Sequence, residues 1–376
     1  MKFTIQQEDL LKALNVVAGI VPGKTTLPIL TSILIEADDK GARFSATNLD
    51  ISATTVCVKT TLKRKGRAAV PATKFVAFVR SLAPAEVTIE EKGGKVSVSS
   101  GRTALEEPGM NADEFPALPE LGGEKALEVP AAALASMIRA TSYAVSRDET
   151  RPALLGILWE VRPASLRLVA TDAHRLARVE RKLKLGAREE RTLIADTSGL
   201  LQLARLAEDE ETVHLHLGAN QLSFRVGDTV LHTRLREGPF PDYEAVIPKS
   251  NNRIVTVDRE ALSQAVKRVA ITADRITNQI RLGIESGRME LSATGSDGSR
   301  AEDQLEVGYE GDALEIGFNF NYLLDCLKNM RAETIELAIK DSQSAALVRP
   351  SAADQEGGEA GEDLLCLLMP LRLSAD

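Results

Sequence analysis

Hydrophobic and polar positions along the chain form one arrangement that occurs three times. Each copy begins with a short alternating strand and a helix whose apolar residues are spaced i, i+4. A strand, a turn and another strand follow, and a second helix then leads into strictly alternating strands. The pattern predicts antiparallel strands between six helices, at residues 10–20, 73–83, 131–144, 197–207, 259–271 and 320–331.

The repeat is clearest at one short motif. It reads ATNLD at 46–50, ATDAHRLA at 170–177 and ATGSDGSRA at 293–301, so that its threonines, Thr47, Thr171 and Thr294, are 124 and 123 residues apart. Two similar linkers, FPALP at 115–119 and the segment 240–248, mark boundaries near residues 122 and 248. We therefore expect an α+β protein of three repeated domains, 1–122, 123–248 and 249–376. Each would have two helices packed on antiparallel sheets.

Length, charge and cysteine content narrow the classes of protein. A chain of 376 residues is too long for one ordinary core, and its net charge of −8 argues against a uniformly basic nucleic-acid binder. Three cysteines without metal or redox spacing indicate reduced thiols. The N-terminus lacks the apolar core of a signal peptide, and no apolar run approaches the roughly 20 residues of a membrane span. We expect a cytoplasmic protein with no membrane partner.

The charge is unevenly distributed. The predicted helices hold ten basic and two acidic residues, a net +8, which leaves −16 for the rest of the chain. Such helices indicate sequence-independent contact with the phosphates of double-stranded DNA. The alternative for any single helix is a solvated face of good helix formers. The residues that we expect to face DNA are Lys12, Arg80, Arg139, Arg205, Lys267, Arg268 and Lys328.

An acidic protein could hold DNA by enclosing it. Repeated units joined head to tail close into a ring when the rotation between them permits. Two chains would supply six units and twelve helices, and helices about 10 Å wide would give a circumference of roughly 120 Å. The channel would then be roughly 25–30 Å across, enough for a duplex and water.

Two patterns suggest chemistry other than binding. Asp172, His174 and Arg175 would suit acid–base catalysis, but the other repeats lack this cluster and no nucleophile accompanies it, so a binding site formed once per chain fits better. His214 and His216 could ligate a metal, but no third ligand is near. No P-loop or GxGxxG is present. We expect no catalytic residue, metal or cofactor. A scaffold that binds only proteins is the remaining alternative, and the basic helices argue against it.

Five motifs together resemble one family: TLPIL at 26–30, ATDAHRLA at 170–177, FPDY at 240–243, EIGFN at 315–319 and MPLRL at 369–373. The chain resembles the bacterial DNA polymerase III β subunit, the sliding clamp. The resemblance implies a non-catalytic processivity factor, a homodimeric ring of six similar domains around duplex DNA. It also implies an ATP-driven clamp loader, which the ring would contact through the δ subunit. Clamp-binding peptides of the polymerase III α subunit, other polymerases and repair proteins would bind the ring.

The resemblance also implies site residues. The peptide-binding residues would be Leu154, Thr171, Asp172, His174, Arg175, Leu176, Pro241, Val246, Asn319, Tyr322, Met369, Pro370, Leu371 and Arg372. The dimer contact would join Lys74, Phe78, Leu82, Arg102 and Leu105 to Ile271, Glu302 and Asp303. Lys24 and the 147–151 region would touch DNA at the rim. The chain departs from the family at Ala173, where glycine is usual, and in an acidic, glycine-rich loop at 351–363.

Overall fold

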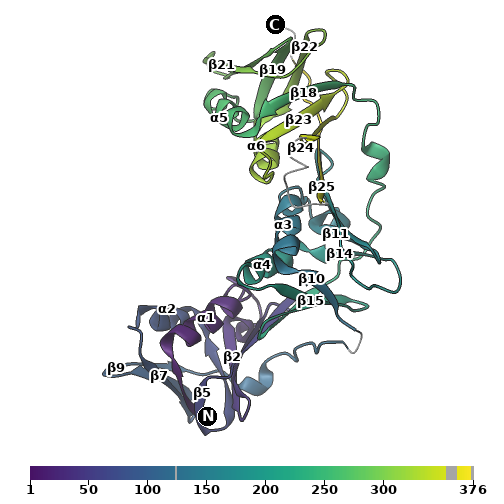
Figure 1. Ribbon diagram of the computed structural model, residues 1–376. Coiled ribbons are helices and arrows are strands. Elements are labelled where there is room, and N and C mark those ends of the chain that lie inside the picture. Colours follow the sequence, from purple (N-terminus) through teal and green to yellow (C-terminus); the bar gives the residue numbers. More distant parts are fainter. Residues whose placement is uncertain (123–124, 353–361, 374–376) are drawn as a thin grey trace. The chain divides into compact units, whose positions relative to one another are not determined.

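The computed structural model describes residues 1–122, 125–352 and 362–373 (Figure 1). All six predicted helices are present in these ranges, with ends shifted by up to three residues. None of the helices there is long and apolar enough to cross a membrane. The helices are α1 (Gln7–Ala18), α2 (Ala72–Ser81), α3 (Ala131–Ser142), α4 (Thr197–Leu206), α5 (Arg259–Val269) and α6 (Phe320–Lys328).

The chain forms two compact units. Unit 1 comprises Met1–Ala135 and Ser198–Leu235, and unit 2 comprises Ser136–Thr197 and Arg236–Asp376. The second predicted domain thus contributes residues to both units. The predicted domain boundaries at 122 and 248 stay a prediction.

Unit 1 contains two antiparallel sheets. The strands of the five-stranded sheet are, in spatial order, β5 (Thr60–Arg64), β1 (Lys2–Gln6), β7 (Glu86–Lys92), β8 (Lys95–Ser100) and β9 (Thr103–Pro108). Those of the eight-stranded sheet are β10 (Leu127–Pro130), β15 (Thr212–Leu217), β16 (Gln221–Val226), β17 (Thr229–Arg234), β4 (Ile51–Cys57), β3 (Gly41–Thr47), β2 (Ser32–Asp38) and β6 (Gly66–Pro71).

Unit 2 contains a matching pair. Its eight-stranded sheet has the order β18 (Arg253–Asp258), β23 (Thr334–Ile339), β24 (Ala346–Pro350), β25 (Glu362–Leu368), β13 (Arg175–Lys182), β12 (Ser165–Thr171), β11 (Gly156–Val161) and β14 (Arg191–Asp196). Its four-stranded sheet has the order β21 (Arg300–Glu306), β20 (Arg288–Thr294), β19 (Gln279–Glu285) and β22 (Leu314–Asn319).

The two eight-stranded sheets have the same topology. In each, four strands of one repeat join four strands of the next through one antiparallel pair, β17 with β4 in unit 1 and β25 with β13 in unit 2. The smaller sheets stop at this point: β9 and β21 are edge strands without a neighbour on one side within the described chain. The smaller sheets of the first and third repeats therefore each correspond to one half of an eight-stranded sheet, and neither half is paired with the other kind within the described chain.

Helices cover one face of the sheets. In unit 1, α1 and α2 lie side by side, and α1 packs Leu10, Leu14 and Val17 against β3 and β4 (Figure 1). In unit 2, α5 and α6 pair in the same way, with Leu262 and Val266 fully buried. These are the i, i+4 pairs that the sequence predicts, because alternating strands and a helical stripe each present one apolar face.

The helices are less basic than predicted. Because α1 begins at Gln7, it includes Glu8 and Asp9, and because α6 ends at Lys328, it excludes Arg331. The six helices hold nine basic and four acidic residues, a net +5, which leaves −13 for the rest of the chain. The predicted helix charge of +8 is right in sign but too large. Part of the error arises because acidic residues are common in the first turn of a helix, as Glu8 and Asp9 are in α1.

Candidate partner-binding site

A tight turn between β12 and β13 carries several predicted contact residues. The Thr171 hydroxyl donates to the carbonyl oxygen of Arg175 at 2.7 Å and accepts the amide hydrogen of Ala173 at 3.1 Å. Asp172 Oδ1 accepts the amides of His174 and Arg175, each at 3.0 Å. Ala173 has φ +76°, in the left-handed region. Thr171 and Asp172 therefore shape the turn, because their polar atoms are bonded to its backbone.

The turn between β3 and β4 in unit 1 has the same construction. The Thr47 hydroxyl donates to the carbonyl of Ile51 at 3.0 Å and accepts the amide of Leu49 at 3.0 Å. Asn48 Oδ1 accepts two amides, and Leu49 has φ +78°. The repeated Ala-Thr-Asx motif thus specifies a backbone shape in both units. What differs is the side chain at its end, Ile51 in unit 1 and Arg175 in unit 2.

The Arg175 guanidinium is held on all sides. Its Nε donates to Asp172 Oδ2 at 3.0 Å, Nη1 to Asp325 Oδ2 at 2.6 Å, and Nη2 to the carbonyl of Tyr143 at 2.6 Å. The ring centroid of Tyr322 lies 4.4 Å from the guanidinium carbon. Burial alone lowers the pKa of Arg175, but bonds to the two carboxylates, Asp325 first, raise it above its ordinary value. Arg175 is therefore a fixed cation that orders the turn and two helix-borne side chains.

Three residues in this cluster were not predicted: Tyr143, Asp325 and Cys366. The Tyr143 hydroxyl lies 2.8 Å from Cys366 Sγ, and burial raises the pKa of Tyr143 well above its ordinary value. Asp325 is the one acidic residue of α6 and lies three residues after Tyr322 on the same helical face. That spacing could have identified Asp325, whereas nothing in the sequence pairs Tyr143 with Cys366.

The C-terminal segment is fixed through its backbone. The amide of Met369 donates to the carbonyl of His174 at 2.9 Å, and the amide of Leu371 to the carbonyl of Gly317 at 2.8 Å. The carbonyl of Arg372 accepts a side-chain amide hydrogen bond at 3.1 Å. Met369 stays 43% exposed beside the turn, and the centroids of the stacked His174 and Tyr322 rings lie 6.4 Å apart. The structure thus joins the predicted C-terminal residues to the Arg175 cluster.

The other predicted residues divide by exposure. Leu154 and Leu176 are buried, so they support the site from beneath. Pro241 and Val246 are exposed on the linker, Val246 at 58%, and Pro370 is partly buried. Asn319 caps α6, its side chain accepting the amide of the second helical residue at 2.9 Å. An exposed methionine beside a rigid polar cluster suits a site for a short peptide.

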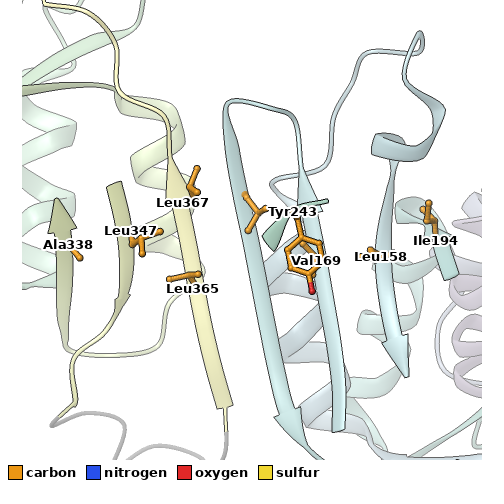
Figure 2. Close-up of a cluster of buried hydrophobic side chains, with 9 residues drawn as sticks. Leu158, Val169, Ile194, Tyr243, Ala338, Leu347, Leu365 and Leu367 are labelled. Atoms are coloured by element: carbon orange, nitrogen blue, oxygen red, sulfur yellow. The ribbon is translucent and has the colours of Figure 1, made fainter. Parts of the chain in front are cut away.

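The linker at 240–248 is anchored by Tyr243, which is 6% exposed in a buried apolar cluster with Leu158, Leu365 and Leu367. Figure 2 shows its ring beside Val169, in line with side chains from β23, β24 and β25. The Tyr243 hydroxyl donates to Glu160 Oε1 at 2.9 Å and accepts from Arg167 Nη1 at 2.8 Å. Burial raises the pKa of Tyr243 to about 12, with Glu160 adding to the shift. This anchor positions Pro241 and Val246.

The residues expected to face DNA lie on exposed helix and loop surfaces. Lys12, Lys24, Arg80, Arg205, Lys267, Arg268 and Lys328 are exposed, and Arg139 is half-buried. Arg80 Nη2 donates to the side-chain oxygen of Asn15 at 3.3 Å. Arg268 pairs with Asp303 at 2.5 Å. The structure therefore brings together two residues that the sequence assigned to different surfaces.

The residues predicted for the dimer contact lie in two places. Those of unit 1 lie on α2 and at β9: Lys74, Phe78, Leu82, Arg102 and Leu105. Those of unit 2 lie just after α5 and on β21: Ile271, Glu302 and Asp303. Lys74 Nζ lies 3.2 Å from the buried Glu107 carboxylate of β9, and Ile271 is 83% exposed. Each group thus borders a free sheet edge.

The alternative patterns also have a place in the structure. His214 and His216 follow one face of β15, where their ladder neighbours include Arg225 and Ser223. No group of three His, Cys, Asp or Glu residues in the described ranges could hold a metal ion. Much of the loop predicted at 351–363 lies outside the described residues.

Comparison with known proteins extends over the whole chain. Residues 1–119, 128–242 and 244–357 match the N-terminal, central and C-terminal domains of the DNA polymerase III beta subunit. The beta sliding clamps of Pseudomonas putida and Escherichia coli are 34% and 30% identical, each over 99% of this chain and 100% of the relative.

Solved structures agree. The DNA polymerase sliding clamp of Bacillus subtilis matches with a TM-score of 0.92 at 28% identity, over 100% of both chains. The griselimycin-bound sliding clamp of Pseudomonas aeruginosa matches with a TM-score of 0.91 at 32% identity, over 99% of this chain and 100% of that one. The three clamp domains and the family expected from the sequence are confirmed, and the chain belongs to the DNA polymerase III beta subunit family.

Proposed function

We propose that the chain acts as a homodimeric ring that encloses duplex DNA in the cytoplasm and tethers the replicative polymerase, without catalytic activity of its own. Its role as a processivity clamp follows from the family, whose curated members are beta sliding clamps. The finer parts of the proposal are the dimer, the enclosed DNA and the peptide site. The single observation that carries the dimer and the enclosed DNA is the pair of unfinished sheets.

Two copies can complete each other's sheets. In both eight-stranded sheets, a half ending in β17 or β25 meets a half beginning with β4 or β13. The strands β1, β7, β8 and β9 form the first kind of half, and β21, β20, β19 and β22 form the second. Joining β9 of one copy to β21 of another would give a third sheet of the same kind. Because each chain has one half of each kind, two chains close into a ring.

The repeat also predicts the register. In unit 1, His232 lies opposite Ser52. Glu106 of β9 corresponds to His232 of β17. Glu90, Ser97 and Glu106 are neighbours across β7, β8 and β9, as His216, Ser223 and His232 are across β15, β16 and β17. Arg300 occupies that of Ser52, since it pairs with Thr294 as Ser52 pairs with Thr47. Glu106 should therefore face Arg300 of the partner subunit, an attractive cross-strand pair. Both side chains are about 60% exposed, at 60% and 62%.

Cysteine cross-linking tests the ring. Glu106→Cys combined with Arg300→Cys should give a covalent dimer in high yield on mild oxidation, because opposed strand residues lie within disulfide range. The control combines Arg102→Cys with Arg300→Cys, which the predicted register separates by four residues, roughly 13 Å. Non-reducing electrophoresis and light scattering would measure the yield and the mass. A strictly monomeric protein at micromolar concentration, or equal yields from both pairs, would reject the proposed dimer.

We propose that the peptide binds beside Arg175, because the turn, α6, the linker and the C-terminal segment supply a fixed cation and exposed apolar side chains. A clamp-binding peptide would bury the exposed Met369 and Val246 side chains. The clamp loader, through its δ subunit, the polymerase III α subunit and other polymerases and repair proteins would share this site, which a flexible methionine suits.

Replacing side chains tests the peptide site better than deleting the C-terminus, because Met369 and Leu371 also make backbone hydrogen bonds. Met369→Ala should weaken binding of an α-subunit peptide about tenfold in a fluorescence titration. Leu49→Ala removes an exposed leucine from the matching turn of unit 1 and should leave binding unchanged. An unaffected affinity in Met369→Ala would refute the site.

A further inference from the structure

The two linkers cross equivalent sheet faces but occupy them differently. The second linker aligns with the first, so that Leu118 takes the place of Tyr243 after the shared Phe-Pro pair. The sheet residues beneath also correspond. Glu36 and Arg43 are opposed in the ladder of β2 and β3, as Glu160 and Arg167 are in the ladder of β11 and β12. The comparison therefore shows what the same pocket does with and without a tyrosine.

In unit 2 the tyrosine fills the pocket and satisfies its polar wall. The Tyr243 hydroxyl bridges Glu160 and Arg167, at 2.9 and 2.8 Å, and the ring packs on the apolar cluster that includes Leu158. The side chains of Arg167 and Glu160 are left only 13% and 16% exposed. Unit 2 thus shows how an Arg–Glu pair above apolar side chains binds a phenol hydroxyl.

In unit 1 the corresponding space is open. A cleft of about 550 Å³ lies between the first linker and the sheet, with Leu34 on its floor and Glu36, Arg43 and Leu118 among its walls. Arg43 and Glu36 still pair, at 3.4 Å, but their side chains are 38% and 32% exposed. No tyrosine of the sequence falls in unit 1. The chain therefore leaves the polar pair without the hydroxyl that its counterpart binds.

We propose that this cleft binds a small para-substituted phenol, whose hydroxyl donates to the Glu36 carboxylate and accepts from the Arg43 guanidinium. The ring would lie on Leu34 and Leu118 and against Val230, which also lines the cleft. The volume of the cleft lies within the usual range for small-ligand sites. The first linker already lines the cleft from Phe115 to Leu121, so a free small phenol fits better than a peptide-borne tyrosine.

The polar pair gives the site selectivity. A ring without a hydroxyl would partly cover Glu36 and Arg43 while leaving them without a new partner, which disfavours it. Arg67, Asp113 and His232 also line the cleft, but Arg67 is engaged by Asp113 at 3.4 Å and by the carbonyl of Ala112 at 2.8 Å. The hydroxyl-binding position is therefore the one that Tyr243 defines in unit 2.

Methyl NMR of the full chain tests the proposal with a matched ligand pair, p-cresol and toluene, which differ only in the hydroxyl. Addition of p-cresol should shift the methyl signals of Leu34, Leu118 and Val230 at millimolar concentration. Toluene should shift the same methyl signals, with an affinity at least fivefold lower than that of p-cresol. Leu118→Tyr fills the cleft from within and should abolish the p-cresol shifts. Glu36→Gln retains the space and should weaken p-cresol about fivefold without affecting toluene.

Several results would overturn the proposal. Equal affinities for p-cresol and toluene would show an apolar cleft without phenol recognition. Undiminished p-cresol binding in Leu118→Tyr, or shifts confined to methyls of unit 2, would place binding elsewhere. If N-acetyltyrosinamide bound and p-cresol did not, the site would take peptide-borne tyrosine rather than a small phenol. Should Leu118→Tyr fail to fold, the Glu36→Gln comparison decides alone.

Discussion

The two eight-stranded sheets share strand order and register, but the face that each presents to its linker differs in polarity. Across β23, β24, β25 and β13 of unit 2, one row of opposed residues is apolar: Ala338, Leu347, Leu367 and Leu176. Across β15, β16, β17 and β4 of unit 1, the equivalent row is polar: His216, Ser223, His232 and Ser52. The apolar row buries Tyr243, whereas the polar row lies beside an open cleft.

This difference shows that topology and surface are specified separately. Strand alternation and the helix-facing residues determine the sheet, and both units have these. The face away from the helices is less constrained, and in unit 2 it is apolar and supports the linker. In unit 1 the matching turn ends in Ile51, so the same backbone carries no fixed cation. A repeated fold thus carries the fixed cation in only one of these two matching turns.

The largest effect should follow removal of the fixed cation. Arg175→Ala leaves Asp172, Asp325 and a tyrosine carbonyl without their partner, which should lower the free energy of unfolding by about 2–3 kcal/mol, since Asp325 is partly exposed. Peptide affinity should fall more than tenfold. Denaturant unfolding followed by the fluorescence of Trp159, the chain's one tryptophan, would report on unit 2. A variant as stable as the parent would show that the cluster does not hold the site together.

Exchanging the linker residues should convert unit 2 toward unit 1. Tyr243→Leu removes two hydrogen bonds and leaves a cavity, so unfolding followed by Trp159 should become easier by about 2 kcal/mol. Tyr243→Phe keeps the ring and should cost about 1 kcal/mol. Equal losses in the two variants would mean that the ring contributes nothing beyond its hydroxyl.

The polar row should make unit 1 sensitive to acid. Burial, with a smaller effect of His216, lowers the pKa of His232 to about 4. An unfolded histidine binds its proton near pH 6.5 and the folded one only near pH 4, so stability should fall as pH drops through that window. The loss between pH 6.5 and pH 4.5 should be about 2 kcal/mol.

His232→Leu, which copies Leu367 of unit 2, should remove this acid loss. Hydrogen exchange of β3 and β4 at pH 6.5 and 4.5 would measure it, with His214→Leu on the same sheet face as the control. An unchanged pH dependence in His232→Leu would contradict the assignment to His232.

The smallest effects concern the two left-handed turn residues. Ala173→Gly and Leu49→Gly should each stabilise their unit by about 0.5–1 kcal/mol, because glycine adopts positive φ without steric cost. The matched pair should behave alike if the turns are equivalent. Opposite signs in the two thermal unfolding midpoints would show that Ala173 has a role beyond its backbone.

Much of the fold was predictable because periodicity records it directly. The i, i+4 pairs and alternating strands located the six helices and the repeat. The ends of α1 and α6 were not predictable to the residue, and the error in helix charge came from Glu8, Asp9 and Arg331. The sequence also could not show that the Thr171–Asp172 motif builds a turn, because that role rests on side-chain bonds to the backbone.

The candidate peptide-binding residues were predictable only through resemblance. These residues come from segments that lie as much as 200 positions apart or more in the sequence. No local pattern places Arg175 beside Asp325 or Tyr143 beside Cys366. The pairing of Arg268 with Asp303 was missed for the same reason, since it joins a helix to an edge strand.

Retention on DNA tests the central claim most directly. The Glu106→Cys, Arg300→Cys protein, loaded on nicked circular DNA and then oxidised, should stay bound through a high-salt wash and be released when the DNA is linearised. Salt screens phosphate contacts but does not open a covalent ring. Release by salt from circular DNA, or equal retention on circular and linear DNA, would contradict enclosure of the duplex.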